Sequence, residues 1–426
     1  MLDLKFIREN PELVKQGIKN KNENDRVDEL LSLDQQRREK ISSVEQLKNQ
    51  RNEVSGSIIP QMIKDGQDTS SLKMEMKKIS GSISNFDSEL QDIEQQIEDI
   101  LMRIPNMPHP SVPVGKSAAD NVEIKLWMPE GFSFQNDKKF LDHTELGKKL
   151  DILDFERGAK VSGSGFPVYV GKGATLERAL INYMLDVHIN QHNYKEVFPP
   201  FLVNKDSMLG TGQLPKMEED MYAIEKDGLY PIPTAEVPIT NLHRDEMMNE
   251  KDLPKRYVGY SACFRREAGS YGKEAKGFLR VHQFNKVEMV KIVKPETSYD
   301  ELEGLVKDAE DILQALKIPY RILMLCTGDL SFNAAKCYDI ETWSPAENKW
   351  LEASSCSNFE DFQARRAKIR FKREGEKKPE FVHTLNGSGL ATSRLMVSIL
   401  ENYQTEKGTI KVPEVLQKYT NFDIID

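Results

Sequence analysis

Apolar residues recur with a helical period through the first hundred residues of the chain. In the second half of this region the spacing alternates between four and three, at Ile79, Ile83, Phe86, Leu90, Ile93, Ile97 and Ile100. Such a heptad seam lets one helix pack along another. A weaker seam precedes it, at Leu30, Leu33, Ile41, Val44, Leu47, Val54 and Ile58. Pro60 and the turn residues 65–68 separate the two seams, so we expect two antiparallel helices that form a coiled-coil hairpin.

Charge is unevenly distributed along the predicted hairpin. Residues 85–102 include six acidic side chains and no basic ones. Nearer the turn, basic residues outnumber acidic ones, at Lys40, Lys48, Arg51, Lys64, Lys73, Lys77 and Lys78. A positive tip suits contact with phosphate groups. The apolar seam is equally consistent with a dimerisation rod, so the residues alone leave both functions open.

A proline-rich segment marks the expected domain boundary. The helical pattern stops near residue 104, and Pro105, Pro108, Pro110 and Pro113 follow. Prolines at this density exclude regular secondary structure and favour a stiff linker. We therefore expect a helical domain over residues 1–104, a linker over residues 105–120 and a second domain over residues 121–426.

The second domain mixes strand-like and helical patterns. Residues 165–170 are typical of a strand, and residues 280–293 alternate apolar and polar side chains as a strand does. Residues 175–191 and 393–402 have the spacing of amphipathic helices. Because strands and helices do not alternate regularly, we expect an α+β domain with an antiparallel sheet flanked by helices.

The composition limits the class of protein but does not indicate a function. The 426 residues are 38% hydrophobic and 30% charged, which fits a folded chain of two or three domains. No apolar run is long enough to span a membrane, and the first residues lack the apolar core of a secretory signal, so we expect a cytoplasmic location. The net charge of -9 gives no general footprint for nucleic acid. The cysteines form no close pair, so we expect buried thiols and no zinc site, at Cys263, Cys326, Cys337 and Cys356.

The densest group of chemically useful residues lies in a predicted long hairpin at residues 263–288. Arg265 and Glu267 are two positions apart, which puts both side chains on one face of a strand. Phe284 and Glu288 share a face for the same reason. A guanidinium, two carboxylates and a ring on one surface suit a triphosphate and a purine. The alternative is an ordinary surface hairpin with cross-strand ion pairs.

Three segments of the chain resemble the signature motifs of class II aminoacyl-tRNA synthetases. The hairpin matches the pattern of motif 2, F-R-x-E, a loop, then R-x-x-x-F-x-x-x-E. Residues 193–200 resemble motif 1, which forms the dimer interface in this class, and residues 386–394 resemble motif 3. Each match is modest evidence alone, whereas three in the expected order are strong.

The resemblance extends to the seryl-tRNA synthetases of bacterial type and covers nearly the whole chain. Residues 210–215, 234–236, 281–284 and 352–355 are similar to segments of this family, and so is the helical hairpin. The resemblance implies an enzyme that activates L-serine with ATP and transfers it to tRNA(Ser). It also implies that residues 1–104 form an arm that binds the long variable arm of the tRNA.

The resemblance implies a role for each matching residue. Arg265 and Arg394 are the expected catalytic residues, and Glu352 and Ser355 the expected Mg²⁺ ligands. In the ATP site Glu267 would bind the adenine amine and Phe284 would stack on adenine. The expected ATP-binding residues are Arg265, Arg266, Glu267, Val281, Phe284, Glu352, Ala353, Ser354, Ser355 and Arg394. The expected serine-binding residues are Thr234, Ala235, Glu236, Arg265, Glu288, Asn386 and Ser388.

The implied partners are a second copy of the chain and one or two species of tRNA. The resemblance implies a homodimer, and charging of tRNA(Sec) as well as tRNA(Ser) where the host has it. Lys273, Lys276 and Arg280 would meet the acceptor end of the tRNA, although a charged loop explains them equally well. Two alternatives are a related ligase that loads a carrier protein and a coiled-coil adaptor without activity. The helical hairpin argues against the carrier-protein ligase, because such relatives lack it. The polar site residues argue against the inactive adaptor, because they are all present.

Overall fold

The computed structural model describes residues 1–134, 140–267 and 276–426. The chain divides into two compact units. The smaller unit contains Leu2–Lys19 and Glu23–Pro105, and the larger contains Met1, Asn20–Asn22 and Asn106–Asp426. Lys273 and the neighbouring residues of the predicted motif 2 loop lie outside the described residues.

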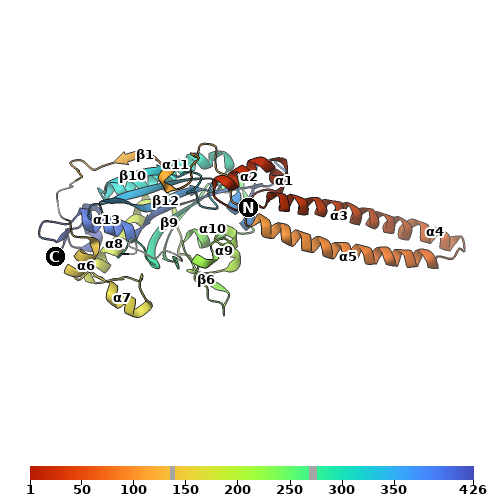
Figure 1. The fold of residues 1–426 in the computed structure, drawn as a ribbon, viewed down its shortest axis with the longest axis horizontal. Helices are drawn as coiled ribbons and strands as arrows, with labels where there is room; N and C mark the ends of the chain where they lie inside the picture. Colours follow the sequence, from red (N-terminus) through yellow and green to blue (C-terminus); the bar gives the residue numbers. More distant parts are fainter. Residues whose placement is uncertain (135–139, 268–275) are drawn as a thin grey trace. The chain divides into compact units, whose positions relative to one another are not determined.

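The smaller unit is a helical hairpin preceded by two short helices (Figure 1). Its antiparallel direction is clear from ion pairs between the long helices, where Arg37 bonds Glu94 and Lys48 bonds Asp87. The predicted seam is buried along α5 at Ile79, Ile83, Ile93, Ile97 and Ile100, and its members Phe86 and Leu90 are partly buried against the same core. The expected coiled-coil arm is therefore confirmed. Its helices are α1 (Leu4–Glu9), α2 (Pro11–Asn20), α3 (Val27–Glu53), α4 (Ile59–Lys64) and α5 (Ser70–Leu101).

A π-helical turn at Val54–Ile58 changes the first seam. A π turn contains more residues than an α turn, so it rotates the following side chains around the helix axis. Ile58 is consequently 40% exposed, and Ile59 packs on the hairpin core in its place. Residues 65–68 form the expected turn between the two long helices, but Pro60 does not break the first of them, because the chain stays helical to Lys64. Pro60 lies in the first turn of α4, where a missing N–H is tolerated.

The larger unit is built on an eight-stranded sheet with the order β1-β10-β11-β12-β15-β9-β8-β4. Neighbouring strands are antiparallel except β4 and β8. This confirms the α+β class with an antiparallel sheet. The strands are β1 (Val122–Trp127), β4 (Lys195–Glu196), β8 (Lys255–Phe264), β9 (Gln283–Val293), β10 (Tyr320–Met324), β11 (Lys336–Ser344), β12 (Lys349–Asn358) and β15 (His383–Ala391).

Helices cover the sheet and share one large hydrophobic core with it. The longest are α8 (Gly171–Asn190), α11 (Ser298–Ala315) and α13 (Thr392–Asn402), and side chains of all three belong to this core. The predicted helices at residues 175–191 and 393–402 correspond to α8 and α13. The shorter helices are α6 (His143–Lys149), α7 (Phe155–Ser162), α9 (Lys205–Thr211), α10 (Glu236–Asn241), α12 (Phe362–Ala367) and α14 (Glu414–Thr420).

The remaining strands form small sheets around this framework. They are β2 (Leu153–Asp154), β3 (Val168–Tyr169), β5 (Leu202–Asn204), β6 (Leu229–Pro231), β7 (Met247–Asn249), β13 (Arg370–Lys372), β14 (Glu380–Phe381), β16 (Ile410–Lys411) and β17 (Ile424–Ile425). The predicted strand at residues 165–170 was too long, since only β3 forms. Gly165 has a φ of +82°, and a Cβ there would lie 2.5 Å from His282. This position therefore requires glycine in a tight loop rather than a strand.

The proline-rich segment is held by hydrogen bonds to the rest of the larger unit. The Asn106 side-chain amide donates to the backbone oxygens of Asn333 and Phe359, at 2.9 and 2.8 Å. The backbone N–H of His109 donates to the Ala335 oxygen at 2.9 Å. The prolines thus follow an irregular path that is fixed by hydrogen bonds to backbone oxygens of the larger unit.

The cysteines and the helices agree with two expectations from the composition. All four cysteines are buried and free, which agrees with the interpretation as buried thiols. Over the described ranges, none of the helices is both long and apolar enough to cross a membrane.

Candidate active site

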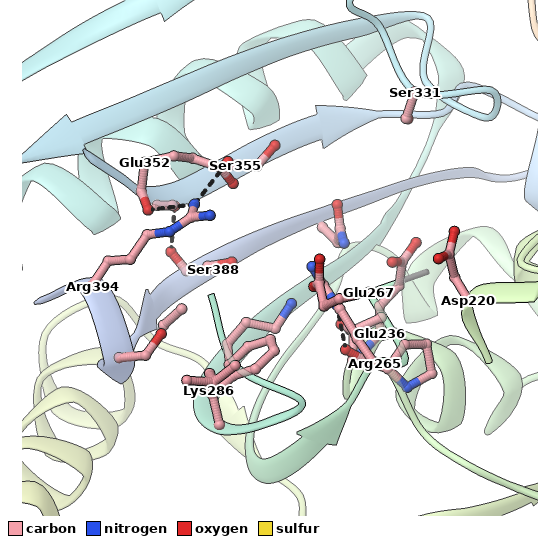
Figure 2. Close-up of a pocket in the computed structure, with 18 of the residues that line it drawn as sticks. Asp220, Glu236, Arg265, Glu267, Lys286, Ser331, Glu352, Ser355, Ser388 and Arg394 are labelled. Carbon is pink, nitrogen blue, oxygen red and sulfur yellow. Dashed lines mark hydrogen bonds and ion pairs between the residues drawn. The ribbon is translucent and has the colours of Figure 1, made fainter. Parts of the chain in front are cut away.

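A cavity of about 570 Å³ opens over the centre of the large sheet. Its walls come from β9, β12 and β15, from the segment that follows β8, and from the first turn of α13. Figure 2 shows the charged residues that face it, with Arg394 turned toward Glu352. Most of the residues that the sequence singled out line this one cavity.

Strand β9 contributes a stripe of side chains on one face. Phe284, Lys286 and Glu288 are two positions apart and follow the strand period. Glu288 is fully buried beneath the cavity lining and forms an ion pair with Lys286. Its carboxylate also accepts hydrogen bonds from the Thr234 hydroxyl at 3.0 Å and the Asn386 amide at 3.2 Å. Three partners therefore fix this carboxylate.

The pairing of β9 with β15 brings two distant segments together. In this register Glu288 lies opposite Ser388, and Ser388 lines the cavity. Asn386 lies two positions earlier on β15 and also lines it. Residues about one hundred positions apart in the chain thereby form one small polar pocket.

Glu236 is a second buried carboxyl group in the cavity wall. It is the first residue of α10, and the Gln363 side-chain amide donates to it at 2.6 Å. Burial, together with the nearby charge of Glu288, raises the pKa of Glu236 to about 7. A buried carboxyl of this kind favours a cationic ligand, because a positive charge would lower that pKa again.

Arg265 and Glu267 lie just beyond the end of β8, so the prediction that they share a strand face was wrong. Glu267 has a φ of +49°, which breaks the strand alternation. Both side chains nevertheless line the cavity. The Arg265 guanidinium lies 5.2 Å from the centre of the Phe284 ring, and Glu267 accepts a 2.6 Å hydrogen bond from Arg280.

Four consecutive residues of β12, Glu352 to Ser355, line the opposite wall. A regular strand would turn alternate residues away, but a register irregularity occurs at this point in the pairing of β11 with β12. Arg394 donates to the Glu352 backbone oxygen at 3.0 Å and to its carboxylate at 3.1 Å. The irregularity therefore concentrates polar groups beside a guanidinium.

The oxygen donors on this wall suit a hard divalent cation. Glu352 and Ser355 provide a carboxylate and a hydroxyl, and the carboxyl group of Asp339 is buried close to both. Burial and the charge of Glu352 raise the pKa of Asp339 well above its usual range. Within the described ranges no group of three or more histidine, cysteine or acidic residues is arranged to hold a metal. Mg²⁺ commonly needs only one or two protein ligands when phosphates and water supply the others.

The structure separates the predicted site residues into two groups. Those that line the cavity are Thr234, Glu236, Arg265, Glu267, Val281, Phe284, Glu352, Ala353, Ser354, Ser355, Asn386, Ser388 and Arg394. Glu288 and Ala235 are buried behind the lining, and the exposed Arg266 is outside it. Arg280 also lines the cavity, whereas Lys276 forms an ion pair with Asp142.

Sequence reasoning missed two residues that matter for the electrostatics. Lys286 lies midway between Phe284 and Glu288, and the strand period that selected those two could have identified it. Gln363 comes from α12, where no sequence pattern marked it, and it bonds Glu236. Both were missed because each acts on a buried carboxyl group that only the fold brings next to it: Lys286 on Glu288, and Gln363 on Glu236.

Family models match most of the chain. The model described as the tRNA synthetase class II core domain (G, H, P, S and T) matches residues 220–403. The model described as the seryl-tRNA synthetase N-terminal domain matches residues 1–108. A serine–tRNA ligase of Chloroherpeton thalassium is 61% identical over 428 residues and covers 100% of both chains. The chain belongs to the seryl-tRNA synthetase family.

Solved structures of seryl-tRNA synthetases also match over the full length. The enzyme of Pyrococcus horikoshii, complexed with ATP, has a TM-score of 0.95 and 41% identity, over 100% of this chain and 99% of that chain. The cytoplasmic serine–tRNA ligase of Naegleria fowleri, in complex with AMP, has a TM-score of 0.88 and 31% identity, with the same coverage. The predicted family is therefore confirmed by sequence and by fold.

Proposed function

We propose that this chain is a serine–tRNA ligase, which activates L-serine with ATP and transfers it to the 3′ end of tRNA(Ser). The observation that carries the proposal is the buried pair Glu236 and Glu288 beside Arg265, in a cavity whose other wall holds Arg394 and Glu352. One end suits a small hydroxylated ammonium compound, and the other suits a polyphosphate. The family membership of the full chain supports the same reaction.

The ATP site is assigned to residues around the Phe284 ring and the β12 wall. Arg265 binds the α-phosphate, and Arg394 binds the γ-phosphate after releasing the Glu352 carboxylate that it contacts in this structure. Phe284 stacks on adenine, and Glu267 accepts from the adenine amine. Glu352 and Ser355 would hold Mg²⁺, which would neutralise phosphate charge. The position of these side chains on the cavity surface supports the assignment.

The serine site is assigned to the two buried carboxylates and their neighbours. Thr234 and Glu236 hold the ammonium group, and Arg265 holds the carboxylate. Glu288, Asn386 and Ser388 surround the hydroxyl. A site whose buried groups are made to bond a hydroxyl rejects analogues that lack one, because those groups would be left unpaired. Alanine is therefore excluded by hydrogen bonding, and threonine by the space that its methyl group needs.

The reaction proceeds in two steps that need no protein nucleophile. An oxygen of the serine carboxylate attacks the α-phosphorus of ATP, and the bond to the β-phosphate oxygen breaks, which gives seryl-adenylate and pyrophosphate. The guanidinium groups of Arg265 and Arg394 position the phosphates and offset their charge. A ribose hydroxyl of the terminal adenosine then attacks the adenylate carbonyl. AMP leaves, and the hydroxyl proton is released.

The partners are assigned by domain. Residues 1–104 form the tRNA-binding domain, residues 105–120 join it to the remainder, and residues 121–426 form the catalytic domain. Lys276 and Arg280, at one end of the motif 2 loop, would meet the acceptor end of the tRNA. The protein works as a homodimer through residues 193–200, and it charges tRNA(Sec) as well in a host that has it.

Replacement of Glu288 by alanine tests the serine pocket. The change removes the acceptor for the substrate hydroxyl and leaves Lys286 unpaired. We expect the KM for serine in ATP–pyrophosphate exchange to rise by more than about tenfold (roughly 1.4 kcal/mol). The KM for ATP, measured on the same preparation, is the internal control and should change little. A rise in the serine KM of less than tenfold would count against the role of Glu288.

The raised pKa of Glu236 predicts a pH dependence of serine binding. Below pH 7 the carboxyl group of the empty site holds a proton, since its pKa is about 7. The ammonium group binds the carboxylate form, so binding displaces that proton. We expect the dissociation constant for serine to increase by up to about tenfold for each pH unit below 7, and to be flat just above it.

Titration calorimetry at several pH values measures this effect. The Glu236→Gln variant should bind serine more weakly and should lose the pH dependence, because the amide cannot ionise. A wild-type dissociation constant that stays constant between about pH 5.5 and pH 7 would rule out Glu236 as the ammonium ligand.

Charge removal at the hairpin tip tests the arm and the second step together. Lys73, Lys77 and Lys78 are exposed on α5 near the turn. Their replacement by alanine should lower charging of tRNA with labelled serine and reduce the slope of log affinity against log salt by up to about 3. Pyrophosphate exchange, which needs no tRNA, should be unchanged.

A charge-matched triple variant provides the control for the tip. Lys160, Lys226 and Lys368 are exposed on the larger unit, and their replacement removes the same charge elsewhere. We expect this variant to charge tRNA as the wild type does. Equal losses in the two variants would show that only the net charge matters. Wild-type protein that performs exchange but charges no tRNA would contradict the proposed second step.

A further inference from the structure

A buried carboxyl group outside the cavity connects three elements of the larger unit. Glu177 belongs to α8 and is only 5% exposed. One of its oxygens, Oε1, accepts a hydrogen bond from the Thr392 hydroxyl at 2.6 Å and another from the Asn285 amide at 2.8 Å. The Thr392 hydroxyl also lies 3.1 Å from the Asn285 backbone oxygen. Glu177, Thr392 and Asn285 therefore form a closed triangle, which we call the Glu177 tie.

Two of the partners of Glu177, Asn285 and Thr392, are next to residues of the ATP site; a third partner, Tyr169, is on β3. Asn285 directly follows Phe284 on β9, and its side chain points to the other face of the strand. Thr392 is the first residue of α13 and precedes Arg394 by two positions. The Glu177 tie therefore joins the strand that presents the adenine ring platform to the helix that presents the phosphate-binding guanidinium.

The backbone does not fix this junction by itself. The pairing of β9 with β15 is irregular between Ser388 and Ala391, where the chain leaves the strand for α13. No side chain of the N-cap residue, Ala391, caps the first turn of α13. A helix start without a cap bond is held less firmly than a capped one. The bond from Thr392 to Glu177 supplies a buried side-chain contact at the first residue of this helix.

Glu177 also lies where a full negative charge is disfavoured. Burial raises its pKa to about 7, and the bonds from Thr392, Asn285 and Tyr169 oppose that rise. Near neutral pH about half of the protein therefore carries the uncharged carboxyl group, which a glutamine amide matches in shape. Glutamine would keep the acceptor oxygen, whereas leucine would fill the space without one. The two substitutions separate the hydrogen bonds from the packing.

We propose that Glu177 is a positioning residue for ATP, which sets the distance between Phe284 and Arg394 through Asn285 and Thr392. The inference rests on the proposed function, because it takes those two residues as ATP ligands. It goes further in assigning a role to a residue that touches neither substrate. The serine pocket lies farther along both strands, at Glu288 and Ser388, so its geometry should depend much less on the tie.

The effect of Glu177→Leu on ATP binding tests the proposal. We expect the ATP dissociation constant, measured by titration calorimetry without serine, to rise about tenfold, because two hydrogen bonds to the site framework are lost. The serine KM in pyrophosphate exchange should stay within about twofold. Glu177→Gln should restore ATP binding to within about threefold of the wild type, since it keeps the acceptor. Thr392→Val, which breaks the tie from the other end, should weaken ATP binding as Glu177→Leu does.

Glu310→Leu is the matched control for the loss of a buried carboxyl. Glu310 is 6% exposed on α11 and accepts a hydrogen bond from Tyr320 at 2.5 Å, outside the cavity lining. This variant should lose thermal stability but bind ATP normally. A merely structural role for Glu177 predicts that ATP and serine affinities fall together, or that ATP binding is unchanged in folded Glu177→Leu and Thr392→Val proteins. Either result would overturn the proposal.

Failure of the proposed function gives a different result. If the wild type binds ATP but shows no serine-dependent exchange, the reaction assignment is wrong. The ATP titrations of the Glu177 and Thr392 variants still decide whether the tie positions the nucleotide site.

Discussion

The pairing of β9 with β15 is the constraint on which the site depends. It places Glu288 opposite Ser388 and brings Asn386 to the same pocket, although the two segments are far apart in the chain. A shift by one residue would turn every side chain of β9 to the other face. Phe284, Lys286 and Glu288 would then leave the cavity together. The register therefore fixes the Phe284 ring and the polar pocket in a single step.

Charge balance explains why so many ionisable groups can share this cavity. Glu288 is fully buried, and its ion pair with Lys286 and two further hydrogen bonds offset the cost of burying it. Glu236 is buried and lies near the charge of Glu288, and both effects raise its pKa. On the β12 wall, Arg394 contacts Glu352. The cavity is thus prepared for one ligand with a positive group and another with several negative groups.

The sequence predicted the parts of this structure that follow from local periodicity or from matched motifs. The seam from Ile79 to Ile100 identified the hairpin, because a heptad spacing of apolar residues is typical of a helix that packs along another helix. It could not identify the π-helical turn that exposes Ile58, because no single residue type specifies such a turn. The cavity residues were predicted by motif, whereas Lys286 and Gln363 acquire meaning only through Glu288 and Glu236. The geometry of Arg265 and Glu267 was missed because β8 ends at Phe264, so neither residue belongs to the strand.

Amino-acid-dependent ATP–pyrophosphate exchange, with each of the twenty amino acids and without tRNA, tests the central claim most directly. The account predicts exchange with serine alone, because only serine offers both the ammonium group for Glu236 and a hydroxyl of the right size for Glu288. Comparable exchange with another amino acid would contradict the assignment of the pocket. No exchange with any amino acid, from folded protein that binds ATP, would contradict the activation step itself.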